Sequence, residues 1–165
     1  LLHVADREPH GTLIGHFARA NPHAAIAPDL ASTAIFHGPH AYVTPSWYAH
    51  PSNAVPTWNY AVVHAHGTIE LAHDAAETRA ILDLMIHRFE AGRAAPWKLG
   101  LDPGPLAAMV GAIVGFRIRV KRIDAKFKLS QNRMPEDRRR VAAGLDAEGC
   151  ADAAATASWL RDAMP

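Results

Sequence analysis

The chain has 165 residues, a formal net charge of +1 and one cysteine, Cys150. Since a domain typically takes roughly 150 residues, we expect one domain over residues 1–165, large enough to bury a core. A single cysteine excludes an internal disulfide and a cysteine-based zinc site, and it fits a reducing, cytoplasmic compartment. No apolar run approaches the roughly 20 residues that cross a membrane as a helix, so we expect no membrane partner.

The charge is distributed unevenly along the chain. Residues 1–74 contain two lysines or arginines and five acidic residues, whereas residues 115–140 contain ten lysines or arginines and three acidic residues. A basic segment is a candidate surface for phosphate, on a cofactor or on a nucleic acid. DNA contact through residues 115–140, including Arg138, Arg139 and Arg140, is therefore one expectation. A solvated charged face is the other, because no helix-turn-helix pair accompanies the arginines.

The first half of the chain is typical of short strands separated by turn residues. Alternating apolar residues predict a strand over Thr12–Ala18, with a strand end before it over residues 1–4 and a turn over residues 6–11. Residues 23–30 are alanine-rich and contain Pro28, which favours a short helix or turn. Gly38-Pro39 is a hairpin signal, so we expect two strands, over residues 33–37 and 40–44.

The longest strand is predicted over residues 58–71. Both of its faces are apolar as far as Val63, which is typical of a central strand. Within it, Gly67 indicates a bulge or a close backbone contact.

Helical periodicity follows the long strand. Asp74 and Glu77 form a capping-box-like start, and the apolar spacing from Ile81 to Phe89 predicts a helix that Gly92 ends. A short helix is expected over residues 104–111. Period-two alternation then returns from Phe116, interrupted by a turn at Asp124-Ala125.

The end of the chain is predicted to be helical. Pro135 followed by acidic residues is a typical helix start, so helices are expected over residues 135–147 and 151–164. The order of elements favours a mainly β fold. We expect a small antiparallel barrel over about residues 1–131, with peripheral α-helices over about residues 135–164.

Two polar and aromatic clusters, in residues 39–71 and 126–133, are the candidate binding site. FMN needs cations for its phosphate, hydroxyl and amide partners for its ribityl chain, and flat walls for its ring. The clusters supply the polar partners Ser46, Thr57, Asn59, Ser130, Gln131 and Asn132, the cations Lys126, Lys128 and Arg133, and the possible walls Trp47, Tyr48, Trp58 and Tyr60. A sugar or a nucleotide would draw on the same residue types, and Trp58 and Tyr60, on an apolar strand, also suit a core.

The eleven histidines offer a different site. His64 and His66 share a strand face because they are two apart, and His37 and His40 flank a predicted turn. Imidazole suits a metal or haem, although no motif with ordered ligand spacing is present.

Three motifs resemble the PaiB-like family of FMN-binding negative transcriptional regulators. They are Gly38-Pro39-His40-Ala41-Tyr42-Val43-Thr44-Pro45-Ser46-Trp47-Tyr48, Val55-Pro56-Thr57-Trp58-Asn59-Tyr60 and Lys128-Leu129-Ser130-Gln131-Asn132-Arg133, with Gly15-His16-Phe17-Ala18-Arg19-Ala20-Asn21-Pro22 upstream. The resemblance covers about residues 11–145. It implies an FMN-binding split β-barrel, a homodimer with FMN at the subunit interface, and a repressor role.

We therefore expect an FMN site built from Ser46, Trp47, Thr57, Trp58, Asn59, Lys128, Ser130, Gln131, Asn132 and Arg133. Because family members carry further elements before the point where Leu1 stands, we also expect an N-terminal portion of the gene product that precedes this sequence. A flavin-dependent oxidoreductase on the same fold is the main alternative, with His64 and His66 as its candidate acids or bases. A haem- or metal-binding split barrel that uses the histidines is the other.

Overall fold

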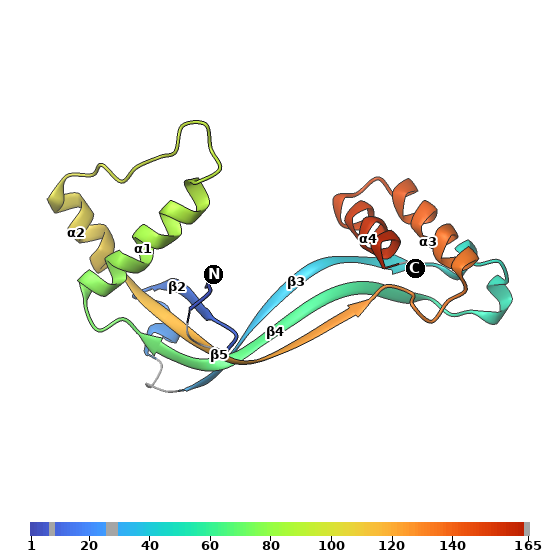
Figure 1. Ribbon diagram of the computed structural model, residues 1–165, viewed down its shortest axis with the longest axis horizontal. Helices are drawn as coiled ribbons and strands as arrows, with labels where there is room; N and C mark the ends of the chain where they lie inside the picture. Colours follow the sequence, from blue (N-terminus) through green and yellow to red (C-terminus); the bar gives the residue numbers. More distant parts are fainter. Residues whose placement is uncertain (7–8, 26–29, 164–165) are drawn as a thin grey trace. The chain divides into compact units, whose positions relative to one another are not determined.

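A computed structural model describes residues 1–6, 9–25 and 30–163 (Figure 1). Five strands form one sheet in the order β1-β2-β5-β4-β3. Their bounds are β1 Leu2–Val4, β2 Thr12–Ala18, β3 Ala31–Val43, β4 Thr57–Leu71 and β5 Ile113–Lys128. The pairs β1/β2 and β2/β5 are antiparallel. Since β1 and β3 are the edges of this sheet, these strands form an open sheet rather than a closed barrel.

Four α-helices accompany the sheet: α1 Ala75–Glu90, α2 Pro103–Gly111, α3 Pro135–Ala147 and α4 Ala151–Asp162. Short 3-10 helices cover Pro22–Ala25, Pro45–Trp47 and Pro51–Asn53. The start of α1 is a reciprocal cap, because the Asp74 carboxylate accepts from the Glu77 amide at 2.8 Å and the Glu77 carboxylate accepts from the His73 amide at 2.8 Å. None of the helices in the described ranges is long and apolar enough to span a membrane.

The predicted mainly β class, with antiparallel strands and peripheral helices, is confirmed, but the strands expected to form a barrel over about residues 1–131 do not close. Strand β2 and helix α3 have the predicted bounds, and β4 is a central strand between β5 and β3. The close approach at Gly67 is also confirmed, since a Cβ there would lie 2.1 Å from the Arg119 carbonyl oxygen. Helix α1 ends at Glu90, two residues before Gly92.

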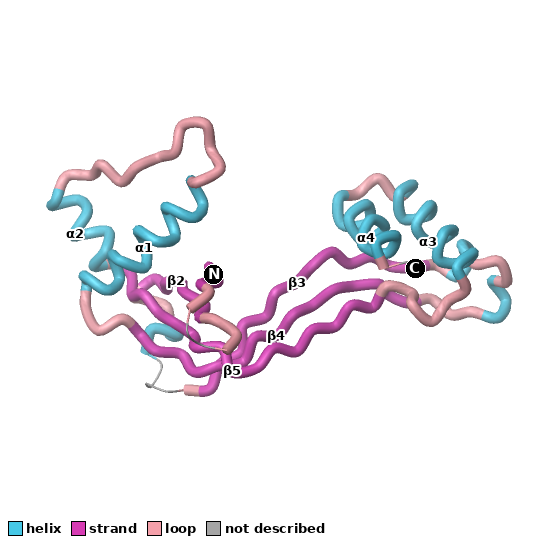
Figure 2. Tube along the Cα trace, in the orientation of Figure 1, coloured by secondary structure: helices cyan, strands magenta, loops and turns pink. Residues whose placement is uncertain are grey.

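Two predicted turns are wrong. Figure 2 shows β3 and β5 as unbroken strands, so neither Gly38-Pro39 nor Asp124-Ala125 reverses the chain. Proline lacks an N–H, and it is tolerated in β3 because that strand lies at an edge of the sheet. In β5, pairing with neighbouring strands outweighs a weak local turn preference. Of the helix or turn predicted over residues 23–30, the 3-10 helix Pro22–Ala25 is described, and residues 26–29 lie outside the described ranges.

The chain divides into two compact units, named here unit 1 (Leu1–Ala34 and Ala65–Ile123) and unit 2 (Ile35–His64 and Asp124–Pro165). Unit 1 has a core of seven buried residues: Leu13, Ala34, Ala65, Ile69, Phe116, Ile118 and Val120. Unit 2 has its own core, made of Ala41, Val43, Tyr48, Val141, Ala142, Leu145, Ala153, Ala157 and Leu160. That residues 1–165 act as one domain stays a prediction.

Unit 2 is a layer of helix on sheet. Figure 1 shows α3 and α4 beside the strands of this unit, and their apolar faces pack on Ala41 and Val43 of β3. The side chain of Arg138 in α3 is buried and donates to the carbonyl oxygens of Ala163, at 2.8 Å, and Leu160, at 3.3 Å. These bonds join α3 to the C-terminal turn of α4, where backbone carbonyls have no intrahelical partner.

Candidate functional site

A cavity of about 250 Å³ in unit 2 lies where β4 begins and β5 ends. Its lining contains six of the predicted cofactor residues: Thr57, Asn59, Lys128, Ser130, Asn132 and Arg133. Tyr48 and Val55 complete it. The alternation of side chains along β4 explains why Thr57 and Asn59 both line the cavity, because residues two apart on a strand share a face.

The wall of the cavity is fixed by a buried pair. Asn59 is fully buried, and its side-chain amide donates to the Ser130 hydroxyl at 3.0 Å, while that hydroxyl lies 3.1 Å from the Asn59 amide oxygen. Ser130 has φ of 57°, a left-handed backbone that is uncommon outside glycine. The bond to Asn59 helps to offset the cost of that conformation, and it ties the turn after β5 to β4.

The cavity carries positive charge. Lys128 donates to the Thr57 hydroxyl, and the guanidinium of Arg133 lies 4.4 Å from the centre of the Tyr48 ring. Neither a carboxylate nor a histidine belongs to the lining, as far as the described residues show. Two cations, hydroxyls and amides are the chemistry that binds a phosphate or a polyol.

Two of the predicted residues have structural contacts outside this cavity. The indole of Trp47 packs on α3, because a Cβ at Gly144 would lie 2.4 Å from its ring atoms. The Gln131 side chain accepts from the Leu129 amide at 2.8 Å and donates to the Phe127 carbonyl at 2.6 Å. Gln131 therefore stabilises the chain at the end of β5.

The other two predicted residues outside the cavity are exposed. Ser46 bonds to the Thr44 hydroxyl at the start of a 3-10 helix. Trp58 is 51% exposed and has Tyr42 edge-on at 5.9 Å and His40 at 6.2 Å. It lines a separate hollow of about 480 Å³ on β3 and β4. The strand period separates it from Thr57 and Asn59, so one continuous motif is divided between two surfaces.

Val55 was not predicted for the site, because an apolar residue before a strand carries no signal for a cavity wall. Tyr48, expected as an aromatic wall, does line the cavity. Tyr48 is 3% exposed, and its hydroxyl has no hydrogen-bond partner among the residues that the structure describes.

We expect Tyr48→Phe to leave the stability of the ligand-free protein unchanged or to raise it. A buried hydroxyl without a partner costs roughly 1–3 kcal/mol of desolvation, and phenylalanine keeps the ring under Arg133 while removing that group. Chemical denaturation of the two proteins measures the difference. A loss of more than about 1 kcal/mol, the net worth of a typical hydrogen bond, would show that the hydroxyl has a partner after all.

Much of the charge in the basic segment 115–140 is already engaged. Arg117 lies 3.4 Å from Glu77, and Arg119 lies 3.0 Å from Glu70. Hydrogen bonds from Arg140 and then Arg139 hold the pKa of the Glu136 carboxyl below its usual value. These pairs reduce the positive charge that the segment presents to phosphate, and DNA contact through it stays a prediction.

The histidines form no metal centre in the described part of the chain, where no group of three or more His, Cys, Asp or Glu side chains could hold a metal ion. The ring of His66 lies 3.0 Å from the Thr33 hydroxyl in unit 1, and neither it nor His64 lines the unit 2 cavity.

Comparison with known proteins identifies the family. A family profile described as "Putative FMN-binding domain" matches residues 1–122. This chain belongs to that FMN-binding domain family. The predicted resemblance is thereby confirmed, and FMN is the cofactor of the family. Four of the residues that line the unit 2 cavity lie beyond the matched range: Lys128, Ser130, Asn132 and Arg133.

Individual relatives extend the match. Protease synthase and sporulation protein PAI 2 of Bacillus subtilis is 35% identical over 161 residues, which are 96% of this chain and 76% of that protein. An uncharacterized protein of Aspergillus fumigatus is 35% identical over 84% of this chain and 67% of its own length. Among solved structures, the flavocytochrome Anf3 of Azotobacter vinelandii is 15% identical with a TM-score of 0.46, and the match covers 76% of this chain and 52% of that one.

Proposed function

We propose that this protein binds FMN in a regulatory role, with the phosphate and ribityl end of the cofactor in the unit 2 cavity. The observation that supports this most is the gathering of Lys128, Arg133, Ser130 and Asn59 around one cavity. Lysine and arginine are the usual partners of a phosphate. Hydroxyl and amide groups match the hydroxyls of a ribityl chain.

The size of the cavity limits what it can hold. Pockets that enclose a drug-sized ligand measure about 300–1,000 Å³, and this one measures about 250 Å³. It therefore suits one end of FMN rather than the whole molecule. We propose that a second copy of the chain completes the site around the ring, as the family resemblance implies. A monomer mass by light scattering with FMN bound would overturn that part.

The chemistry of the lining favours binding and regulation over catalysis. Bound FMN supplies hydride and electron transfer, and an oxidoreductase usually adds a protein acid or base near the reacting atoms. The described lining offers neither a carboxylate nor a histidine for that purpose. The name of the Bacillus relative refers to protease synthesis and sporulation, which supports a regulatory role for this chain by analogy.

Comparing FMN with riboflavin tests the proposed orientation. We expect FMN to bind at least about 10-fold more tightly, because riboflavin lacks the phosphate and with it the charge-assisted hydrogen bonds to the cavity cations. Quenching of flavin fluorescence during titration measures both affinities. Equal affinities, or no binding of either flavin, would contradict the proposal.

The variant Lys128→Met makes the same test more specific. It should weaken FMN binding by about 10-fold, the effect of losing one charge-assisted bond, and leave the affinity for riboflavin nearly unchanged. Lys98→Met is the matched control, since Lys98 is exposed in unit 1 and should affect neither flavin. A parallel loss for both flavins in Lys128→Met would indicate general damage to the cavity rather than a phosphate contact.

A further inference from the structure

The fold fixes the position of the Tyr48 side chain, which lines the unit 2 cavity. Tyr48 directly follows the 3-10 helix Pro45–Trp47, and its amide donates to the Pro45 carbonyl at 3.0 Å. The side chain belongs to the core of unit 2, together with Val141 and Leu145 of α3. Its hydroxyl therefore cannot turn toward solvent unless the ring leaves the core.

The hydroxyl of Tyr48 is buried and unsatisfied. Its oxygen has almost no contact with solvent, and no residue in the described ranges forms a hydrogen bond with it. Buried tyrosine hydroxyls usually have a partner, because burial without one removes the bonds to water and replaces them with nothing. Phenylalanine would fill the same space without that cost. A tyrosine is explained at this position if a group from outside the chain supplies the missing partner.

Arg133 brings a positive charge to the same place. Its guanidinium lies 4.4 Å from the centre of the Tyr48 ring, and its amide donates to the Ser130 carbonyl at 3.0 Å, which fixes the turn that carries it. Arg133 forms no ion pair with a carboxylate of the described chain. The nearby acid Asp137 accepts from the Ala49 amide at 2.8 Å and lies outside the cavity lining. The charge of Arg133 is thus available to a ligand.

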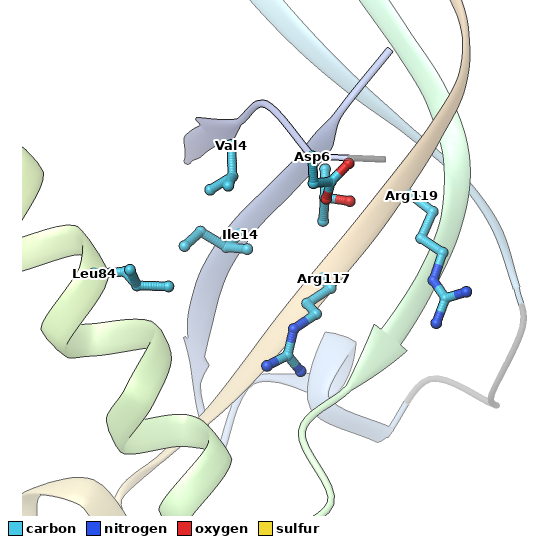
Figure 3. Close-up of a pocket in the computed structure, with 7 residues that line it drawn as sticks. Val4, Asp6, Ile14, Leu84, Arg117 and Arg119 are labelled. Carbon is cyan, nitrogen blue, oxygen red and sulfur yellow. The ribbon is translucent and has the colours of Figure 1, made fainter. Parts of the chain in front are cut away.

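A cavity of about 390 Å³ in unit 1, named here the unit 1 cavity, differs in this respect. It is lined by Val4, Asp6, Thr12, Ile14, Leu84, Arg117 and Arg119. Figure 3 shows Asp6 and the two arginines at this cavity. Arg117 lies 3.4 Å from Glu77. Arg119 lies 3.0 Å from Glu70. Because carboxylates already offset both cations, an anion gains less there than in the unit 2 cavity.

A phosphate fits the donors around Tyr48. Lysine and arginine side chains only donate hydrogen bonds, and a phenol can donate as well, so Tyr48, Lys128 and Arg133 can bind one acceptor together. Hydrogen bonds to a charged oxygen are the short, strong ones. A cation would be repelled by Lys128 and Arg133. A neutral ligand or a water molecule would satisfy the hydroxyl but leave both cations without a counter-charge.

We propose that the Tyr48 hydroxyl donates a hydrogen bond to the phosphate of bound FMN and recognises that group together with Arg133 and Lys128. This inference rests on the proposed function. Because the hydroxyl is sealed from water in the ligand-free protein, the guanidinium on its ring shifts toward the phosphate when FMN binds and uncovers the hydroxyl. Binding thereby gives the unsatisfied hydroxyl a charged partner, and it selects flavins that end in a phosphate.

Titration of the full chain carrying Tyr48→Phe with FMN and with riboflavin tests the proposal, with quenching of flavin fluorescence as the signal. We expect the affinity for FMN to fall by about 10-fold or more, since a hydrogen bond to a charged group is lost. The affinity for riboflavin should stay unchanged, because riboflavin has no phosphate. Chemical denaturation of the ligand-free variant checks that a weaker affinity does not come from a damaged fold.

Tyr42→Phe is the matched control, because it removes the same hydroxyl from an exposed residue of unit 2 outside the cavity. It should leave the affinity for both flavins unchanged. Equal FMN affinity in Tyr48→Phe and the unsubstituted protein would overturn this inference and leave the proposed function standing. An equal loss for FMN and riboflavin would also overturn it, by placing the hydroxyl on the ribityl chain. Absence of FMN binding to the unsubstituted protein would overturn the proposed function and this inference together.

Discussion

We expect Arg138→Ala to lower the free energy of unfolding by about 2–3 kcal/mol, more than the substitution of any other single arginine in the basic segment. The side chain is 6% exposed, and its two backbone acceptors are the carbonyls of Leu160 and Ala163. A cation at a helix C-terminus that is partly buried contributes up to about 2 kcal/mol. The apolar stem of the arginine adds packing that alanine cannot replace.

Arg139→Ala is the matched control for this variant. Arg139 is one residue away on the same helix, its side chain is 65% exposed, and its partner is Glu136 on the surface at 3.3 Å. Exposed ion pairs contribute about 0–1 kcal/mol. Urea denaturation of both variants gives the comparison, and equal losses in the two would refute the structural role of Arg138. A fall in DNA affinity for Arg139→Ala would instead revive the DNA expectation, and its dependence on salt would check it.

The arginine triplet shows what charge counting leaves out. In the sequence, Arg138, Arg139 and Arg140 look equivalent, and together they suggested a surface for nucleic acid. Helix periodicity puts the first of them against α4 and the other two beside Glu136. The direction that each side chain takes depends on which face of α3 is buried, and that is decided by packing with α4 rather than by local sequence.

Helix and strand boundaries were predictable where local signals and long-range pairing agree. Helix α3 begins at the expected residue, Pro135, which acidic residues follow in the sequence. The alternation of apolar residues correctly predicted the bounds of β2. At Gly38-Pro39 the two disagree, because the dipeptide favours a turn whereas the edge position in the sheet permits an extended proline. Pairing with the rest of the sheet determined the structure there, and a single sequence does not show which strands pair.

The candidate site was predictable in residue type and only partly in position. Thr57, Trp58 and Asn59 were assigned together, although a strand sends the middle residue to the opposite face. The unit 1 cavity could not be predicted, since it depends on the register that brings Val4, Thr12 and Arg119 into one row. Residues 1–6 and 115–120 carry no motif that would suggest this arrangement.

The second large effect concerns Trp47, which was predicted to be a cofactor-binding residue. We expect Gly144→Ala to destabilise the protein by about 1–3 kcal/mol, the usual cost of overpacking a core. Helix propensity alone predicts the opposite sign, because alanine is favoured over glycine inside a helix by about 1 kcal/mol. The Trp47 ring reverses the sign, since the new Cβ would lie 2.4 Å from two of its atoms.

A double-mutant cycle separates the two contributions. In a Trp47→Ala background the obstruction is gone, and Gly144→Ala should become neutral or stabilising, so the two substitutions should couple by more than about 1 kcal/mol. Gly104→Ala in α2 is the control, because nothing lies within 4 Å of its new Cβ. Additive effects of the Trp47 and Gly144 substitutions would mean that the indole does not rest on α3. In that case Trp47 would be available to line a flavin site, and FMN titration of Trp47→Ala would then show a loss of affinity that the packed arrangement does not predict.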